Sequence, residues 1–536
     1  MKKTKAKTAV SKGARDHRVR KVLPLVLAIL DGWGVREGQH TDDPTTIART
    51  PFLDELKAHY PYALLGAHGY FVGLPHGQDG NSEAGHLNLG AGRIVEQDAV
   101  YITKSIKNGT FFKNQALITA IEHVRRNKSN LHLMGLLSNY NSGHASPDHV
   151  QALLKFIEQR KVKKVFLHLF TDGRDSPRYD AVKLLTEVAS RFRNGEVVAS
   201  LCGRLYAMDR KKDWSRTEQA YNLLTRGAGI AETSAETALR HAYNRGESDE
   251  YLSPTVITDA RHRPLGAISD HDAVIFWNLR SDRARQLAKP FAQAEFERLN
   301  PGSFKRWRVL TDLCYVALTD FGPDLGNILT AYSSRDVRDS LPMALRSLKQ
   351  LYLAESEKFA HVTYFFNGGY DHPVGREDRQ LVASPNVASY ELTPAMSARK
   401  LERLIMVALK KKSHDVVVVN FSNLDMIGHT GNLRACIAAL EVVDGCLKRI
   451  GREVRARGGT MVVTGDHGNI EETVNIATGE IDTEHSKNPV PFCLYNRAYR
   501  GKQFGRRSGV LGDVAPTLLD LVGLPKPRAM TRKSLL

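Results

Sequence analysis

The segment of residues 22–30 is a continuous apolar run that ends directly at Asp31-Gly32-Trp33-Gly34. An uninterrupted apolar run of this length is typical of a strand that is buried on both faces of a parallel sheet. Open α/β sheets bind their ligands at the carboxyl ends of such strands, so Asp31 is a candidate site residue. Apolar runs that end in polar residues recur along the chain, and they predict an α/β fold.

A second feature is the stretch Asn81-Ser82-Glu83-Ala84-Gly85-His86, which follows a glycine-rich loop. A serine between turn-forming residues, followed by small residues and an apolar run, is typical of the start of a helix. Backbone N–H groups and the helix dipole favour anions there, so the position suits a phosphate group. Most serines in this setting only cap a helix, so the stretch alone does not distinguish a nucleophile from an ordinary cap.

With 536 residues the chain is too long for one ordinary hydrophobic core, which predicts at least two domains. No apolar run reaches the length of about 18 residues that a membrane-spanning helix needs, so we expect a soluble protein. The five cysteines are scattered, which argues against a disulfide framework and against a zinc site built from cysteines. Their scarcity favours a reducing compartment, and we expect the protein in the cytoplasm.

Residues 1–21 contain nine Lys or Arg residues and one acid, Asp16, and they account for part of the net charge of +18. A block of like charge without apolar periodicity predicts a disordered arm. The arm lacks the apolar segment of a secretory signal and is not the Arg- and Ser-rich amphipath of a transit peptide. Two interpretations stay open: a solvated tail, or a segment that contacts nucleic acid or another acidic surface.

Between about Asp98 and Asp324 the chain repeats the alternation of strands and helices. Four apolar runs predict strands there, and a helix is expected at His149–Arg160 between the first two. The expected strands are Leu131–Leu137, Val165–Phe170, Val197–Leu201 and Ala273–Trp277.

Each of these four strands is followed by polar residues, mostly His or Arg. In strand order they are His144, then Asp172-Gly173-Arg174-Asp175, then Arg204 and Arg210, then Asn278, Arg280, Arg283 and Arg285. One arginine alone is more often part of a surface ion pair. Four strands that deliver Arg or His to one sheet edge instead predict a pocket for a small anion with more than one acidic group, because guanidinium groups suit carboxylate and phosphate oxygens.

After about Asn327 the first architecture resumes. Helices are expected at Asp336–Tyr352 and Ala398–Lys411, and apolar residues from Leu433 to Leu447 recur at helical spacing. The expected strands are Val362–Phe366, Val416–Val419, Met461–Thr464 and Val490–Leu494. These patterns predict one domain, residues 22–97 and 325–536, that is interrupted by a second, residues 98–324.

The outer domain has carboxylates and imidazoles after its strands or in polar loops: Asp31, Asp425, His429, Asp466, His467 and His485. An Asp-x-x-x-His spacing and an adjacent Asp-His pair supply the oxygen and nitrogen ligands that Mn²⁺ or Zn²⁺ accepts. Each alone could be a structural histidine or a turn, but together they indicate a site for two metal ions. Two ions about 3.5–4 Å apart can deprotonate a serine and stabilise an in-line phosphoryl transfer, which would activate Ser82.

Seven motifs follow one another along the chain. They are Leu30-Asp31-Gly32-Trp33-Gly34, Asn81-Ser82-Glu83-Ala84-Gly85-His86-Leu87-Asn88-Leu89-Gly90-Ala91-Gly92-Arg93, Asp172-Gly173-Arg174-Asp175, Tyr206-Ala207-Met208-Asp209-Arg210, Arg280-Ser281-Asp282-Arg283-Ala284-Arg285, Glu357-Lys358-Phe359-Ala360-His361-Val362-Thr363 and Asp466-His467-Gly468-Asn469. Together they resemble cofactor-independent (2,3-bisphosphoglycerate-independent) phosphoglycerate mutase, from about Val22 to Leu536. The wider resemblance is to the alkaline phosphatase superfamily.

The resemblance implies an alkaline-phosphatase-like metal domain interrupted by an inserted α/β substrate domain. It implies the interconversion of 3-phosphoglycerate and 2-phosphoglycerate, a step of glycolysis and gluconeogenesis, through a phosphoserine and without bisphosphoglycerate. Two divalent ions are implied, with Mn²⁺ first and Mg²⁺, Co²⁺ or Zn²⁺ as alternatives. The expected enzyme is a cytoplasmic monomer.

By motif position, one ion would be held by Asp425, His429 and His485, and the other by Asp31, Ser82, Asp466 and His467. The substrate would be held by His144, Arg174, Asp175, Arg204, Arg210, Arg280, Arg283 and Lys358. Ser82, Asp175 and Lys358 would be catalytic, with Ser82 taking the phosphoryl group and Asp175 a candidate for proton transfer. Residues 139–146 depart from the usual Asp-Gly-Gly-Val-His-Ser-His of the family, which puts the role of His144 in question.

Two other functions stay open at this point. Another enzyme of the same superfamily, a phosphatase, phosphodiesterase or phosphopentomutase, would share the metal ligands but would not need the arginine-lined insert. A binding protein would instead use the basic arm on RNA or an acidic surface, with steep salt dependence.

Overall fold

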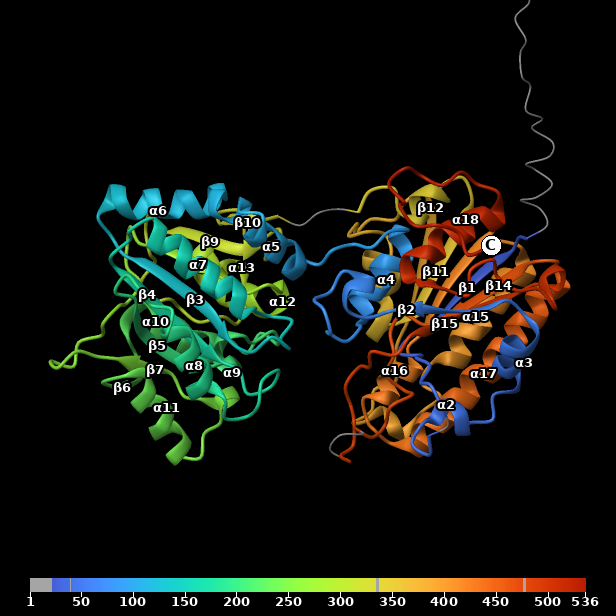
Figure 1. The fold of residues 1–536 in the computed structure, drawn as a ribbon, viewed down its shortest axis with the longest axis horizontal. Helices are drawn as coiled ribbons and strands as arrows, with labels where there is room; N and C mark the ends of the chain where they lie inside the picture. The colour runs from blue at the N-terminus through green and yellow to red at the C-terminus, as the bar shows by residue number, and fades with distance from the viewer. Residues whose placement is uncertain (1–21, 39, 334–336, 476–478) are drawn as a thin grey trace, which may run out of the picture. The chain divides into compact units, whose positions relative to one another are not determined.

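The computed structural model describes residues 22–38, 40–333, 337–475 and 479–536. The described residues form two compact units, one within residues 22–97 and 337–536 and one within residues 98–333. Figure 1 shows that each unit is a β-sheet flanked by helices, which confirms the expected α/β class. The basic arm, residues 1–21, lies outside the described residues, so its disorder and its contacts stay predictions.

The first unit contains an eight-stranded sheet in the order β12-β11-β13-β1-β14-β15-β2-β16. Its strands are β1 (Leu25–Leu30), β2 (Tyr62–Gly66), β11 (Lys349–Glu355), β12 (Arg376–Val382), β13 (Val416–Phe421), β14 (Thr460–Thr464), β15 (Val490–Tyr495) and β16 (Ser508–Val510). The five strands from β12 to β14 run parallel, so their carboxyl ends meet at one edge of the sheet.

The central position of β1, between β13 and β14, explains why its sequence is apolar at every residue. Alternate residues from Val26 to Leu30 pack in the core on one face of the sheet, and those from Leu25 to Ile29 pack in the core on the other. Helices α3 (Pro51–His59), α15 (Ala398–Lys411) and α17 (Leu433–Ala456) cover the first face, and α4 (Ser82–Ala91) and α18 (Val514–Val522) cover the second.

The prediction of a helix at Asp336–Tyr352 is wrong. Within its described part the structure has only the short helix α14 (Leu341–Ala344), and strand β11 begins at Lys349. Leu345, Leu348 and Leu351 have helical spacing, which caused the error. Strand β11 lies between β12 and β13, and the hydrogen bonds to both neighbours outweigh the local preference.

The prediction of a strand at Val362–Phe366 is also wrong, because this segment forms the π-helix η5 (His361–Phe365). It packs against α4 at close range. A Cβ atom at Gly90 would lie 1.9 Å from the carbonyl oxygen of Phe366, so this approach requires glycine on α4. The β-branched and aromatic residues of the segment favoured a strand, and packing against α4 decided otherwise.

The second unit contains another eight-stranded sheet, in the order β10-β9-β8-β3-β4-β5-β7-β6. Its strands are β3 (Leu131–Leu137), β4 (Val165–Thr171), β5 (Val197–Gly203), β6 (Ile230–Glu232), β7 (Thr255–Ile257), β8 (Ala273–Phe276), β9 (Cys314–Thr319) and β10 (Leu329–Tyr332). The four expected strands are β3, β4, β5 and β8, which are neighbours in this sheet. The sequence placed the end of the inserted domain at Asp324, but β10 pairs with β9, so the compact unit includes β10, which ends at Tyr332.

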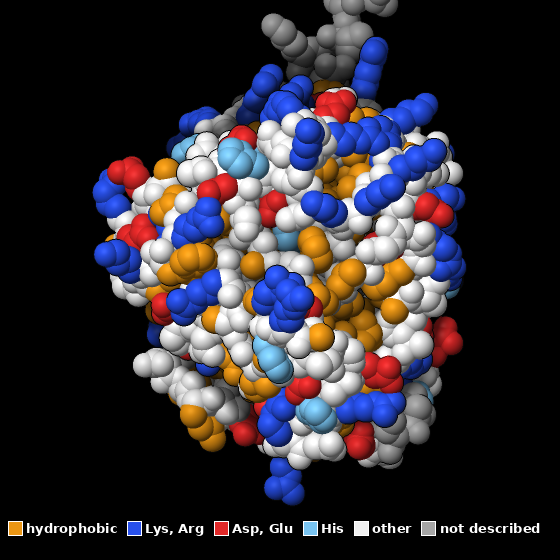
Figure 2. Space-filling model, turned by 90° about the vertical axis from the view of Figure 1, so that its left-hand side faces the viewer, with side chains coloured by type: hydrophobic (Ala, Val, Ile, Leu, Met, Phe, Trp, Pro, Cys, Tyr) orange, Lys and Arg blue, Asp and Glu red, His pale blue; other side chains and the backbone are white. Residues whose placement is uncertain are grey.

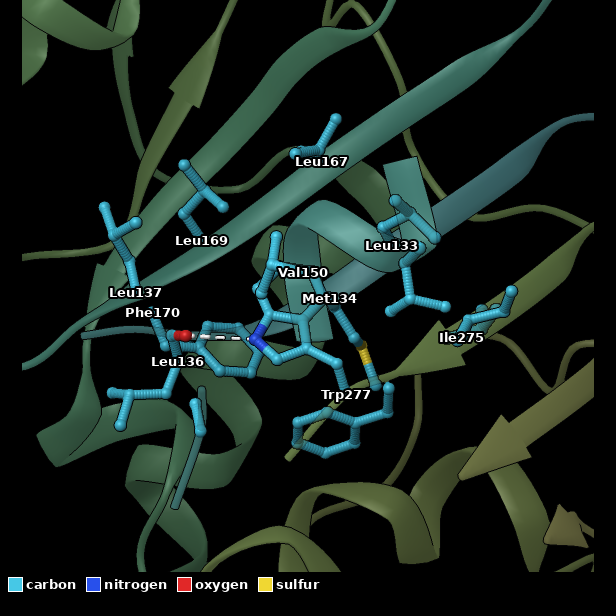
Figure 3. Packing of buried hydrophobic residues seen from close by; sticks show 14 of the residues in the cluster. Leu133, Met134, Leu136, Leu137, Val150, Leu167, Leu169, Phe170, Ile275 and Trp277 are labelled. Atoms are coloured by element: carbon cyan, nitrogen blue, oxygen red, sulfur yellow. Dashed lines mark hydrogen bonds between the residues drawn. The ribbon is translucent and has the colours of Figure 1, made fainter. Parts of the chain in front are cut away.

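One cluster of buried apolar side chains joins this sheet to its helices. The principal helices are α5 (Asp98–Lys107), α6 (Gln115–Asn127), α7 (Pro147–Gln159), α8 (Ala181–Ala189), α10 (Trp214–Arg226), α11 (Ala235–Asn244) and α12 (Ser281–Ala292). Figure 3 shows Trp277 among apolar side chains of the cluster, with its indole N–H donating to the Leu136 carbonyl oxygen at 3.0 Å. A Cβ atom at Gly135 would lie 2.6 Å from the indole ring, so the packing requires glycine there.

The surface is positively charged beyond the basic arm. On the face shown in Figure 2, Lys and Arg side chains are dispersed among acidic, apolar and neutral ones. Residues 1–21, with nine basic side chains and one acid, account for less than half of the net charge of +18. Among the helices of the described residues, none is both long and apolar enough to cross a membrane.

Glu355, the last residue of β11, is a buried carboxyl group that makes stability depend on pH. Burial raises the pKa of Glu355 from 4.5 to about 7, and a hydrogen bond from the Ser397 backbone N–H at 2.9 Å only partly offsets this effect. The folded protein therefore keeps a proton that the unfolded chain loses above about pH 4.5. Stability should fall as the pH rises from about 4.5 to about 7.

Glu355→Gln should remove this contribution. Between about pH 5 and about pH 7.5, the free energy of unfolding should fall by about 2 kcal/mol less in the variant than in wild type. Urea unfolding of both proteins at the two pH values measures the difference. The exposed neighbour Glu357 provides the matched control, because Glu357→Gln should behave like wild type. An identical pH dependence in wild type and Glu355→Gln would contradict the prediction.

Candidate active site

The carboxyl ends of four neighbouring strands in the first unit carry most of the expected metal ligands. The strands lie in the order β11-β13-β1-β14. The residues that follow them are, in that order, Lys358, Asp425, Asp31, and Asp466 with His467. His429 follows the helix α16 (Asn423–Gly428), His485 lies in the loop before β15, and Ser82 is the first residue of α4.

The hydroxyl group of Ser82 is buried among ionisable side chains. Its Oγ lies 2.6 Å from Lys358 Nζ, 2.9 Å from His467 Nε2 and 3.1 Å from Asp31 Oδ1. The cap of α4 is the preceding residue, Asn81, whose Oδ1 accepts a hydrogen bond from the Ala84 N–H. The Ser82 hydroxyl is therefore not needed as a helix cap, which favours the nucleophile over the cap.

Lys358 is a buried cation held between two buried carboxylates. Its Nζ lies 2.7 Å from Asp31 Oδ1 and 2.6 Å from Asp425 Oδ2. Burial opposes the charge, but Asp31 and Asp425 outweigh it and raise the pKa of Lys358 above its usual value. Burial would likewise raise the pKa of each carboxyl group, but Lys358 lowers the pKa of Asp31 and Asp425 well below the usual range. All three groups are therefore charged at neutral pH.

Two histidines are oriented as metal ligands usually are. The Nδ1 atoms of His429 and His485 lie 2.7 and 2.8 Å from the carbonyl oxygens of Thr483 and Gly80, which places a proton on Nδ1. Their Nε2 atoms lie 3.2 Å apart and 3.4 and 3.2 Å from Asp425 Oδ1. With Nδ1 protonated, both Nε2 atoms and Asp425 Oδ1 turn lone pairs toward one another, and a cation between them, either a proton or a metal ion, offsets their repulsion. This donor set fits a divalent metal ion.

His467 lies among three carboxylates. Its Nε2 is 3.4 Å from Asp31 Oδ1, 3.6 Å from Asp466 Oδ2 and 3.8 Å from Asp425 Oδ1. Burial lowers the pKa of His467, but the carboxylates, Asp466 foremost, raise it to about 9. The same excess of negative charge suits divalent cations. The sequence assigned His467 to the ion of Asp31 and Asp466, and its distances to Asp31 and Asp425 differ by only a few tenths of an ångström.

Sequence reasoning missed two buried residues of this site, His86 and Asn420. His86 Nδ1 lies 3.1 Å from Asp466 Oδ2 and 2.9 Å from the Ser82 carbonyl oxygen. Asn420 Nδ2 donates to Asp31 Oδ2 at 2.6 Å and lies 2.9 Å from His86 Nε2. The donor atoms of Asp31, His86 and Asp466 form one group close enough for an ion, and those of Asp425, His467 and His485 form another. His86 follows Ser82 by four residues, a spacing that puts both on one helix face and could have identified it.

In the second unit the expected anion-binding residues also follow neighbouring strands, which lie in the order β8-β3-β4-β5. Arg280 and Arg283 follow β8, His144 follows β3, Arg174 and Asp175 follow β4, and Arg204 and Arg210 follow β5.

The buried Arg204 and the partly buried Asp175 form the centre of this second set. Arg204 Nη1 lies 3.1 Å from Asp175 Oδ1 and also contacts the buried Asp172. The Ser142 hydroxyl donates to Asp175 Oδ2 at 2.7 Å. Burial would raise the pKa of Asp175, but Arg204 and then Ser142 lower it below its usual value, so Asp175 is a carboxylate at neutral pH.

Asp282, which sequence reasoning missed, connects two of the expected arginines. Its Oδ2 lies 2.9 Å from Arg210 Nη1, and its Oδ1 lies 3.5 Å from Arg280 Nε. Burial, followed by Arg280 and Arg204, lowers the pKa of His144 to about 4, so this ring is neutral at neutral pH.

Arg283 and Arg174 differ in their surroundings. Burial and the neighbouring arginines Arg210, Arg204 and Arg174 lower the pKa of Arg283, a sign of excess positive charge that an anion would relieve. The side chain of Arg174 is 58 % exposed and lies 3.8 Å from Glu250, so it stands at the periphery of the set.

Comparison with known proteins places the chain among phosphoglycerate mutases. The Metalloenzyme superfamily model matches residues 23–526. The 2,3-bisphosphoglycerate-independent phosphoglycerate mutase 1 of Methanosarcina acetivorans is 44% identical over 519 residues, covering 96% of this chain and 98% of that protein. The corresponding mutase of Chloroflexus aggregans is 43% identical over 535 residues, covering 96% of this chain and 98% of that protein.

The fold agrees with these sequence relations. A crystal structure of Leishmania mexicana phosphoglycerate mutase at low cobalt concentration matches with a TM-score of 0.74 and 28% sequence identity, covering 95% of this chain and 97% of that one. The chain therefore belongs to the family of 2,3-bisphosphoglycerate-independent phosphoglycerate mutases, which are isomerases of the Metalloenzyme superfamily.

Proposed function

We propose that this protein interconverts 3-phosphoglycerate and 2-phosphoglycerate through a phosphoserine on Ser82, without bisphosphoglycerate. The observation that carries the proposal is the surroundings of Ser82 Oγ, with Lys358 Nζ, His467 Nε2 and Asp31 Oδ1 all within 3.1 Å in a buried site. The reaction would serve glycolysis and gluconeogenesis. We expect the enzyme to act as a monomer in the cytoplasm.

Two divalent metal ions are part of this proposal. One would be held by Asp425, His429 and His485, and the other by Asp31, Ser82, Asp466 and His467. Carboxylate and imidazole donors suit Mn²⁺, with Mg²⁺, Co²⁺ or Zn²⁺ as alternatives. Asp466 Oδ2 supports the assignment, because it is buried and, although His86 Nδ1 lies 3.1 Å away, it accepts no well-oriented hydrogen bond from the described residues. Such ions would favour the ionised Ser82 hydroxyl and offset the charge of the phosphoryl oxygens.

Side chains of the first unit would carry out the transfer. Ser82 Oγ forms a bond to phosphorus as the bond from phosphorus to the substrate O3 breaks, and the phosphoryl group then passes from Ser82 to O2 of the same glycerate. Lys358 Nζ, 2.6 Å from Ser82 Oγ, would hold a phosphoryl oxygen and offset its charge.

Side chains of the second unit would hold the glycerate. Asp175, as a carboxylate, would accept the proton that the attacking O2 hydroxyl gives up and would then release it to water. The departing O3 would take up one proton from water, and Ser82 Oγ would begin and end the turnover ionised, so no net proton is gained or lost. The carboxylate and phosphate of the substrate would contact the cationic and polar residues of this unit, which are His144, Arg174, Arg204, Arg210, Arg280 and Arg283.

The test is direct conversion. Purified protein with Mn²⁺ should turn 3-phosphoglycerate into 2-phosphoglycerate without bisphosphoglycerate, and ³¹P NMR would follow both esters. Adding 2,3-bisphosphoglycerate should not change the rate, and a chelator should stop the reaction until Mn²⁺ is restored. Release of inorganic phosphate in place of 2-phosphoglycerate would identify a phosphatase and refute the proposal.

A further inference from the structure

Glu471 is a fully buried carboxylate close to the metal-ligand set, and the proposed function gives it no role. It follows Asp466 and His467 in the turn after β14. Its four hydrogen-bond partners are neutral: Oε2 accepts from the backbone N–H groups of Gly34 and Asn469, both at 3.0 Å. Oε1 accepts from the Ser486 hydroxyl and from Asn488 Nδ2, the latter at 3.1 Å.

These partners belong to the segments that carry the metal ligands. Gly34 lies three residues after Asp31, Asn469 lies two after His467, and Ser486 follows His485. The side chain of Asn469 extends the connection, because its Nδ2 donates to Asp425 Oδ1 at 3.0 Å. One carboxyl group therefore joins three ligand segments directly and a fourth through Asn469.

The backbone is shaped around this carboxylate. A Cβ atom at Gly34 would lie 2.2 Å from Glu471 Oε1, and one at Gly468 would lie 2.3 Å from the same oxygen. Both segments approach so closely that only glycine fits at these two positions. The space is therefore matched to the side chain of Glu471.

An ionised carboxyl group suits this place because it only accepts hydrogen bonds and can take four of them. A glutamine at this position would turn its NH₂ group toward groups that themselves donate hydrogen bonds. At least one of these buried donors would then lack an acceptor, which costs free energy. Burial raises the pKa of Glu471, and the hydrogen bonds from Ser486 and its neighbours oppose that effect. Burying a carboxylate whose four hydrogen-bond partners are all neutral costs free energy. A neutral side chain in a purely structural role would avoid this cost.

We propose that Glu471 is a positioning residue that fixes the spacing between the ligand segments of Asp31, His467, His485 and Asp425. The proposal rests on the proposed metal-dependent function. Residues that hydrogen-bond the surroundings of metal ligands orient those ligands, and their loss lowers metal affinity by about 10–100-fold. A contact that only supported the fold would leave metal affinity unchanged.

The experiment compares Mn²⁺ binding with stability in the metal-free protein. Chelator-treated wild type and Glu471→Gln are titrated with Mn²⁺ by calorimetry, and the unfolding midpoint of each is measured without metal. The affinity of Glu471→Gln should fall by about 10–100-fold. The matched control is Glu472→Gln at the neighbouring, partly exposed glutamate, which should bind Mn²⁺ as wild type does.

A second variant covers the case in which Glu471→Gln does not fold. Asn488→Ala removes one of the four donors and should weaken Mn²⁺ binding by about threefold to tenfold. Wild-type affinity in the folded variants would overturn the proposal, even if their unfolding midpoints fall. Absence of Mn²⁺ binding by wild type itself would instead overturn the proposed function, and with it the role of Glu471.

Discussion

Ser82→Ala is expected to lower mutase activity at least about a thousandfold while the fold is kept, because the variant has no oxygen to accept the phosphoryl group. The side chain is small and buried, and α4 keeps its cap at Asn81, so circular dichroism and the unfolding midpoint should change little. After rapid acid quenching, wild type incubated with 3-phosphoglycerate should carry one phosphoryl group by mass spectrometry. Ser82→Ala should carry none.

The matched control for this variant is Ser340→Ala. Ser340 is a buried serine of the same unit, at the start of α14, and its hydroxyl makes no cap hydrogen bond. This variant should therefore keep near-normal activity. If Ser82→Ala retained a substantial fraction of wild-type activity, the phosphoserine pathway would be wrong for this protein.

Lys358→Met should have the second largest effect, on stability as well as on activity. Lys358 Nζ is the cation between Asp31 and Asp425, at 2.7 and 2.6 Å. Removing it leaves two buried carboxylates without their counter-ion, which should destabilise the metal-free protein by about 3 kcal/mol. Activity should fall at least about a hundredfold, because the phosphoryl oxygens lose a buried positive charge in the transfer.

The stability effect should depend on metal. Mn²⁺ would restore positive charge next to the two carboxylates, so the unfolding midpoint of Lys358→Met should recover more on Mn²⁺ addition than that of wild type. Scanning calorimetry with and without Mn²⁺ measures both effects. Lys349→Met, at the exposed first residue of β11, should show neither. An unchanged midpoint of metal-free Lys358→Met would show that this charge does not stabilise the site.

The positions of the strands that carry the site could be predicted because their signals are local. Strand β1 is apolar at every residue and ends directly before Asp31. Strand β14 ends two residues before Asp466. Parallel strands bring their carboxyl ends to one edge, so polar residues after such runs are expected close together. The structure bears this out within each unit: Asp31, Asp425 and His467 converge in the first, and Asp175 and Arg204 in the second.

The errors arose where a local pattern competed with tertiary packing. Leu345, Leu348 and Leu351 have helical spacing, yet residues 349–355 form β11 because two neighbouring strands offer hydrogen bonds on both sides. Residues 361–365 have the composition of a strand, yet they form η5 against α4. Propensity differences are small compared with the burial of a whole element, so packing decides such cases.

Apolar runs, their polar ends and the order of motifs along the chain were enough to establish the α/β class and the family, because each depends on residues that are adjacent in sequence. The contributions of Asn420, Asp282 and Glu471 could not be read in this way. Glu471 and Gly34 are separated by 437 positions, and Asn420 and Asp31 by 389, and each pair meets only in the folded chain. A hydrogen bond depends on distance and direction in space, so the partners of a buried polar group are known only once the tertiary structure is.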